Sequence, residues 1–367
     1  MKKLFVFLPF LLLVVSCTPG PKDSYWDGQK KFTLGRGVNV GIWLSQSDVR
    51  GIERENFFTE KDVEFLASCG YDHIRLPIDE EQFWNAKGEK IDTAFTLLNN
   101  ALQWCSKHHL RVLVDLHIIR SHHFLMDAPP LWTDPKEQDK FIGLWEQLSA
   151  ELIKYPVNQV GYEIMNEAVA KDPEDWNKLI ARTVAAIRKN EPARTIIIGS
   201  NMWQQVQTFD VLKVPEGDTN IILSFHFYSP FLFTHHTAPW TAIGDYKGPV
   251  QYPGLTIDET NLKGLPEKLV EAIRWDNKVF NRDTMEMMMM KAITKAQSLG
   301  LPLYCGEFGC LRSVDPQQRL NWFADMIAIF NKHQIGWASW EYKDQFGIVY
   351  GDYTKPDSLL IKTLLGK

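Results

Sequence analysis

Eight short apolar runs, separated by longer segments with helical periodicity, constrain the fold of this 367-residue chain more than any other feature. Parallel strands need helix-sized connections, so this alternation predicts a parallel sheet that is covered on both faces. Eight such units predict an α/β fold of the (β/α)8 TIM barrel type, with its active site at the carboxyl ends of the strands. The predicted strands cover residues 35–40, 72–76, 111–116, 160–164, 195–198, 221–225, 303–306 and 335–339.

The segments between these strands carry helix signals of their own. Thr59 is a plausible N-cap, Gly70 a plausible stop, and Pro173 stands near a predicted first turn. A doubly wound open sheet is the rival fold, but it needs a Gly-rich phosphate-binding turn after the first strand, and residues 37–41 do not provide one. The predicted helices cover residues 59–67, 91–108, 136–154, 173–190, 284–299 and 316–333 and begin again at 357, and residues 202–213 give the weakest helix signal.

A stretch of about 230–283 does not fit the repeat, because it is long, poorly periodic and rich in Pro, Gly and aromatic residues. A loop of this length inside a compact domain is usually functional or has small elements of its own. We therefore predict an insertion after the sixth strand, forming a lid or subdomain over the active site. It belongs to a single catalytic domain of residues 32–367.

The N-terminus reads as an export signal. Two lysines precede a short apolar run that ends at Ser16 and Cys17, as in a secretory signal peptide, and the run is too short to span a bilayer comfortably. Residues 14–17 are similar to a bacterial lipobox, which predicts that Cys17 is lipidated; the alternative is an ordinary signal peptide with an incidental cysteine. We expect a signal peptide over 1–17, a tether over 18–31, and an exported protein anchored to a bacterial membrane, at its periplasmic face or the cell surface.

Charge and cysteine usage narrow the possible partners. The formal net charge is −5 and the basic residues are dispersed, so no nucleic-acid-binding stripe is present. The four cysteines after Cys17 have no metal-ligand spacing, so we expect buried free thiols and no metal site. A monomer is the default expectation for the oligomeric state. The 13 tryptophans are many for this length, and an indole makes a good platform for a ligand. Trp43 and Trp203, after the first and fifth strands, are either such platforms or core residues.

Polar side chains collect where the apolar runs end, as an active site at a barrel rim requires. Two of them are glutamates, Glu167 and Glu307, and glycoside hydrolysis needs two carboxyl groups that flank the scissile bond. Their separation, which distinguishes retention from inversion, cannot be measured in a sequence. Asn166 offers an amide to a sugar hydroxyl, Tyr228 and Arg75 can hold a nucleophile ionised, and Trp340 can stack on a sugar ring. The residues at the predicted rim are Arg75, His117, Asn166, Glu167, His226, Tyr228, Glu307 and Trp340.

Together these motifs resemble the signatures of glycoside hydrolase family 5. The resemblance runs from about residue 35 to the C-terminus, and it implies that Glu167 is the acid/base, that Glu307 is the nucleophile, and that hydrolysis proceeds with retention and without a metal or organic cofactor. It also implies that the other matching side chains bind substrate, namely Arg75, His117, Asn166, His226, Tyr228 and Trp340. The matching motifs are Arg75-Leu76-Pro77, Asp115-Leu116-His117, Asn166-Glu167-Ala168, His226-Phe227-Tyr228, Gly306-Glu307-Phe308-Gly309 and Ser339-Trp340.

Residues 225–236 and 304–309, with the insertion, are similar to the clostridial endoglucanase C type within that family, which cleaves β-1,4- and mixed-linkage glucans. The leading hypothesis is therefore an endo-β-1,4-glucanase. A β-mannanase or an exo-β-glucosidase would keep the chemistry and change the sugar or the mode of attack. A glycan-binding surface lipoprotein on a barrel without activity is the non-enzymatic alternative, although both glutamates are present.

Overall fold

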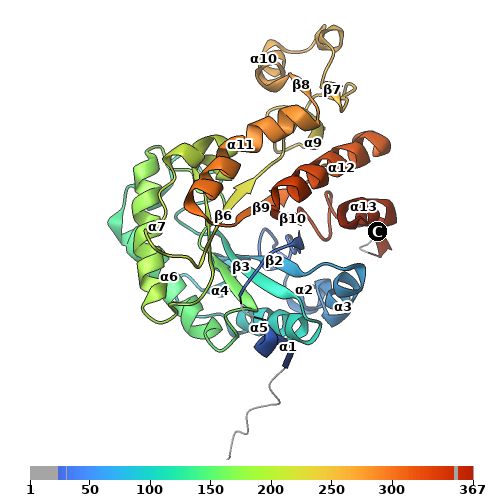
Figure 1. Ribbon diagram of the computed structural model, residues 1–367. Helices are drawn as coiled ribbons and strands as arrows, with labels where there is room; N and C mark the ends of the chain where they lie inside the picture. Colours follow the sequence, from blue (N-terminus) through green and yellow to red (C-terminus); the bar gives the residue numbers. More distant parts are fainter. Residues whose placement is uncertain (1–23, 30, 351–353, 367) are drawn as a thin grey trace, which may run out of the picture.

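The computed structural model describes residues 24–29, 31–350 and 354–366, and its centre is a closed barrel of eight parallel strands surrounded by helices (Figure 1). All eight predicted strands are present, which confirms the (β/α)8 fold. Around the barrel the order is β1-β10-β9-β6-β5-β4-β3-β2. The barrel strands are β1 (Arg36–Asn39), β2 (His73–Asp79), β3 (Arg111–Ile118), β4 (Val160–Glu163), β5 (Ile196–Gly199), β6 (Ile221–His226), β9 (Leu303–Phe308) and β10 (Gly336–Ser339).

The helices begin and end at the capping residues that the sequence provides. Thr59 forms a capping box with Asp62, and Gly70 ends the same helix in the left-handed conformation. The fifth crossover contains only the four-residue α8 (Asn201–Gln204) and the six-residue 3-10 helix η2 (Val206–Val211), which explains its weak helix signal. The helices are α1 (Ser24–Gly28), α2 (Gly51–Phe57), α3 (Glu60–Cys69), α4 (Glu80–Phe83), α5 (Asp92–Lys107), η1 (Pro130–Trp132), α6 (Pro135–Leu152), α7 (Pro173–Arg188), α8 (Asn201–Gln204), η2 (Val206–Val211), α9 (Phe231–Thr234), η3 (Glu259–Leu262), α10 (Glu267–Asp276), α11 (Arg282–Leu299), α12 (Pro316–His333) and α13 (Ser358–Leu365). None of the helices in the described part of the chain is both long and apolar enough to cross a bilayer.

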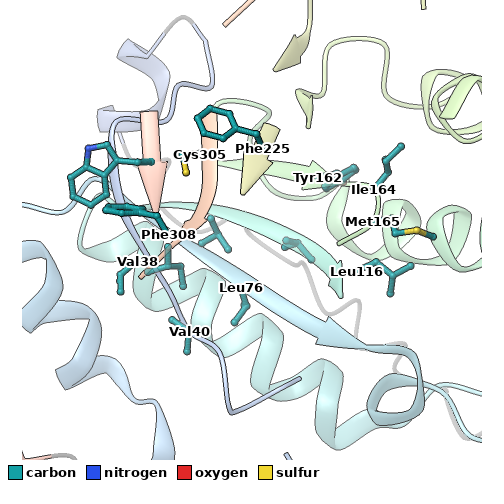
Figure 2. Close-up of a cluster of buried hydrophobic side chains, with 14 of the residues drawn as sticks. Val38, Val40, Leu76, Leu116, Tyr162, Ile164, Met165, Phe225, Cys305 and Phe308 are labelled. Carbon is teal, nitrogen blue, oxygen red and sulfur yellow. The ribbon is translucent and has the colours of Figure 1, made fainter. Parts of the chain in front are cut away.

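The hydrophobic core has two layers because successive strand residues point to opposite sides of the barrel wall. Outward-facing side chains such as Val38, Leu76 and Ile164 belong to the large cluster between strands and helices (Figure 2). A second cluster fills the lower barrel interior: Phe32, Leu113, Ile197, Ile222, Tyr304 and Ala338. The inward positions further along the strands are polar, as Leu113 is followed on β3 by Asp115 and His117. The apolar plug thus supports a polar layer at the carboxyl ends of the strands.

The segment before β1 packs on the opposite end of the barrel. Figure 1 shows α1 beside α5. Trp26 of α1 is buried, and its indole N–H donates to Ser106 Oγ at 3.1 Å, while Tyr25 stacks on His109. Residues 24–29, which the sequence assigned to the tether, are therefore packed against the barrel. The predicted signal peptide, Cys17 and the rest of the tether up to residue 23 lie outside the described residues.

The insertion after β6 is a small subdomain with a core of its own. It pairs β7 (Gly254–Leu255) with β8 (Val279–Phe280) in antiparallel fashion, and Figure 1 shows it extending beyond α11. Near its start, Ala238 packs in a cluster with Trp340, so this part of the insertion reaches the barrel rim. Near the C-terminus β11 (Val349–Tyr350) pairs with β12 (Lys355–Pro356). The subdomain core consists of Leu232, Ile243, Tyr246, Ile257, Leu262, Leu269 and Ile273.

Candidate active site

Glu307, inside the carboxyl end of β9, is held by two charge-stabilising donors. Arg75 Nη1 donates to Oε1 at 2.8 Å, and Tyr228 Oη donates to Oε2 at 2.9 Å. Burial raises the pKa of Glu307, but the Arg75 charge and the Tyr228 hydroxyl oppose that rise because both stabilise the carboxylate. Of the two glutamates, Glu307 is therefore the one held in the ionised form.

Glu167 follows β4 on a loop where its own φ is +45°, an uncommon conformation for a residue with a side chain. Its Oε1 lies 2.8 Å from His226 Nδ1. Burial and the neighbouring Glu307 charge raise the pKa of Glu167 well above its ordinary value, which favours the protonated acid. One oxygen of each glutamate and one His226 nitrogen all lie within 4.8 Å of one another. This spacing is short, as in retaining glycosidases, whose two carboxyl groups lie about 5–5.5 Å apart, and unlike inverting ones, where the gap is roughly 6.5–9.5 Å.

Arg75 organises the polar layer beneath the two glutamates. It is fully buried and forms ion pairs with Asp115 at 3.0 Å, Glu163 at 2.7 Å and Glu307 at 2.8 Å. Because burial outweighs the Arg75 charge, the pKa of Asp115 rises to about 7. The guanidinium also donates to the amide oxygens of Asn39 at 2.9 Å and Asn166 at 2.8 Å. With partners on all three nitrogens, Arg75 fixes the floor of the site.

His117, from the end of β3, is fixed on both ring nitrogens. Its Nδ1 lies 2.7 Å from Asp115 Oδ2, and its Nε2 lies 2.9 Å from the amide nitrogen of Gln46. The amide nitrogen can only donate, so Nε2 accepts and the proton is on Nδ1. Burial lowers the pKa of His117 to about 4, so the ring is neutral. The ring stacks on Trp340, with centroids 5.7 Å apart, and so helps to position that indole.

The two tryptophans predicted as platforms lie in different surroundings. Trp203 is half-buried beside the Glu167 loop, because its backbone N–H donates to Ala168 O at 3.3 Å, and its indole N–H donates to Phe124 O at 2.8 Å. Trp43 is instead buried in the core, where its indole N–H is satisfied by Arg54 O at 2.7 Å. The predicted contact between Trp43 and substrate is therefore corrected to core packing. The other residues predicted for the site, including Trp203, lie together at the carboxyl ends of the barrel strands.

Two pairs of adjacent histidines, His122-His123 and His235-His236, could by residue type bind a metal or a sugar, but each has a partner within the protein. His122 is buried and its Nε2 accepts from Val169 N at 3.1 Å, while His236 Nε2 donates to Gly248 O at 2.9 Å. His235 stacks on Phe231. Among the residues that the structure describes, the group with spacing suited to a metal ion is the Glu167–His226–Glu307 set itself.

Four polar residues around the site were not identified from the sequence. Glu163 interrupts the apolar run of the fourth strand, and this single inward charge was a signal that could have been used. Asn39 has the same position in the first strand. Gln46 lies in a loop and Gln204 ends the short α8, and their residue type carries no titratable chemistry that marks a site.

Comparison with known proteins identifies relatives of this site and fold. Residues 40–346 match the family model described as cellulase, glycosyl hydrolase family 5. Endoglucanase C of Acetivibrio thermocellus is 32% identical over 337 residues, covering 90% of this chain and 97% of the relative. Cellodextrinase A of Ruminococcus flavefaciens is 29% identical over 303 residues, covering 82% and 83%. Among solved structures, endoglucanase Cel5A of Thermotoga maritima is similar with a TM-score of 0.71 at 25% identity, covering 90% of this chain and 96% of that one.

Proposed function

Because the chain belongs to the cellulase family, glycosyl hydrolase family 5, we propose that it is a retaining endo-β-1,4-glucanase that cleaves cellulose-like or mixed-linkage β-glucans. The observation that carries the mechanism is the short separation of Glu167 and Glu307 combined with their unequal surroundings. The endoglucanase relatives support the choice of glucan as substrate.

The proposed reaction is a double displacement. Ionised Glu307 attacks the anomeric carbon while protonated Glu167 gives its proton to the departing glycosidic oxygen, which leaves a glycosyl ester on Glu307. Glu167, now ionised, then takes a proton from water as the water attacks the same carbon, and the Glu307 carboxylate is released. Arg75 and Tyr228 stabilise Glu307 as an anion before attack and after release.

A second activity, cleavage of cellodextrins, is favoured by the similarity to Cellodextrinase A. A β-mannanase would use the same two glutamates. Product analysis separates these possibilities, because an endo-enzyme releases a ladder of oligosaccharides early, an exo-enzyme releases one short product, and a mannanase leaves glucan intact.

The test uses the chain from residue 18 onward with barley mixed-linkage β-glucan. We expect glucan oligosaccharides from the wild type and almost none from Glu307→Gln. Glu167→Ala should lose activity on the polymer yet retain activity on substrates whose leaving group needs no proton. Glu191→Gln is a matched control, because Glu191 is also buried but pairs with Arg194 outside the site. Cleavage of mannan alone would change the substrate, and the absence of cleavage on any β-glycan would refute the proposed activity.

For localisation we propose a lipid anchor at Cys17 that leaves the active site facing away from the membrane. The support is the position of α1, which packs at the end of the barrel opposite the catalytic glutamates. Only residues 18–23 separate Cys17 from α1, and a fully extended link of this length reaches about 25 Å at most. Cys17→Ser should move the full-length protein from the membrane fraction to the soluble one; retention of that variant in membranes would contradict the anchor.

A further inference from the structure

Gln204 stands at the end of a backbone segment with an uncommon conformation. Met202, Trp203 and Gln204 have φ values of 52°, 60° and 53°, and three consecutive left-handed residues other than glycine are costly unless surrounding contacts stabilise them. The turn follows β5 directly and brings the Gln204 side chain into the barrel interior, where it is fully buried. It lies next to the Glu167 loop, which contains another left-handed position of the rim.

The hydrogen bonds of the Gln204 side chain go to residues of the active site and of the strands beneath it. Its Oε1 accepts from the backbone N–H of Glu167 at 2.9 Å, and its Nε2 donates to Glu163 Oε1 at 3.2 Å and to Ser224 Oγ at 3.0 Å. The amide has a single orientation that satisfies these contacts, because a backbone N–H can only donate and an ionised carboxylate can only accept.

Strand β5 leaves space for the Gln204 side chain at Gly199. A Cβ on Gly199 would lie only 2.4 Å from Gln204 Cδ, so the absence of a side chain at this position makes space for the amide. Through Glu163, the amide also joins the ion pairs of Arg75, which holds Glu307. A continuous path of hydrogen bonds thus links the backbone of Glu167 to the carboxylate of Glu307.

We propose that Gln204 is a positioning residue that sets the orientation of Glu167 for proton transfer. Its contact with Glu163, which pairs with Arg75, fixes that orientation relative to Glu307. This inference rests on the proposed function, since it assigns proton donation to Glu167. Gln204 does not contact the substrate; it acts through the backbone N–H of the acid. Its loss changes the geometry of proton donation while the nucleophile keeps both of its donors.

The test compares the wild type with Gln204→Met, which keeps the length of the side chain and removes both hydrogen-bonding functions. Phenyl β-cellobioside has a poor leaving group that needs a proton, whereas dinitrophenyl β-cellobioside leaves without one. We expect kcat/KM of Gln204→Met to fall about 10- to 100-fold on the phenyl substrate, the scale of a misplaced catalytic proton donor, and to change little on the dinitrophenyl substrate. An equal fall on both substrates would refute a role in proton transfer.

Two further variants separate this role from a general loss of packing. Gln159→Met is a matched control, because Gln159 is also buried and donates to Leu102 O on the outer side of the barrel at 3.0 Å; it should leave the ratio of the two rates unchanged. If Gln204→Met does not fold, Ser224→Ala removes one contact of the amide and should shift the ratio in the same direction by a smaller factor. An unchanged ratio in folded Ser224→Ala would then overturn the proposal. A wild type inactive on both cellobiosides would instead count against the proposed function.

Discussion

Replacing Tyr228 by phenylalanine removes one hydrogen bond to the nucleophile and keeps the aromatic ring. The Tyr228 hydroxyl donates to Glu307 Oε2 at 2.9 Å, and Glu307 would then keep only Arg75 as a direct donor. This hydroxyl stabilises the carboxylate more than the neutral acid, so it lowers the pKa of Glu307. Its removal must therefore raise that pKa, and the enzyme will lose its ionised nucleophile at a higher pH.

The size of this effect follows from the strength of the bond. A hydrogen bond to a charged group contributes about 1.5–3 kcal/mol. Since one pKa unit corresponds to about 1.36 kcal/mol, the pKa of Glu307 in Tyr228→Phe should rise by about 1–2 units. Glu167 and Glu307 titrate as a pair, so the quantity that moves is the lower apparent pKa of the pair.

The assay is the pH dependence of kcat/KM, whose acidic limb reports the group that must be ionised in the free enzyme. In Tyr228→Phe this limb should move to higher pH by the amount above. Tyr252→Phe is the matched control, because Tyr252 Oη also donates to a carboxylate, Asp325 Oδ2 at 2.7 Å, away from the site. An acidic limb that stays in place while the rate falls would refute the view that Tyr228 keeps Glu307 ionised.

Three further substitutions test the structure beneath the site. Arg75→Met leaves three buried carboxyl partners without their cation and should lower the free energy of unfolding by about 3–5 kcal/mol, measured by urea denaturation; a loss below 1 kcal/mol would contradict its central role. Phe32→Ala opens a cavity in the lower barrel and should lower the free energy of unfolding by about 3–5 kcal/mol in the same assay, with kcat unchanged where the protein is folded; a lowered kcat would show that this apolar cluster also shapes the site. Gly37→Ala places a Cβ 2.2 Å from His73 Nε2 and should prevent stable folding, so a cooperative melt at the wild-type temperature would contradict the observed packing.

The barrel could be predicted from the sequence because its strands are buried on both faces and therefore appear as uninterrupted apolar runs. The helices have readable caps, such as Thr59 and Gly70, which the structure confirms. The insertion and the fifth crossover could not be predicted in detail. Apart from α10, where Leu269 and Ile273 are buried at helical spacing, their elements are short and are held by tertiary contacts, so no periodic pattern marks them.

The members of the site at the rim could be predicted because the fold brings strand ends together, and polar residues at those ends are conspicuous. The residues that hold these side chains in place were harder to predict from the sequence. Gln46 and Gln204 reach the site only because the chain turns through left-handed conformations at both positions, and nothing in their residue type indicates this. Trp43 shows the converse problem, since it follows the first strand as a platform would, yet a carbonyl of α2 satisfies its indole N–H in the core.

The charge balance of the site connects its mechanism to its substrate. Four carboxyl groups, Asp115, Glu163, Glu167 and Glu307, gather around the single guanidinium of Arg75. Burial and the mutual repulsion of these charges raise the pKa values of the carboxyl groups, and the pKa of Glu167 rises well above its ordinary value, which favours its protonated form. The same excess of negative charge opposes the binding of a sugar that carries its own carboxylate, since its charge would have to be desolvated beside these groups. The electrostatics that make Glu167 an acid therefore also favour neutral β-glucans over acidic polysaccharides.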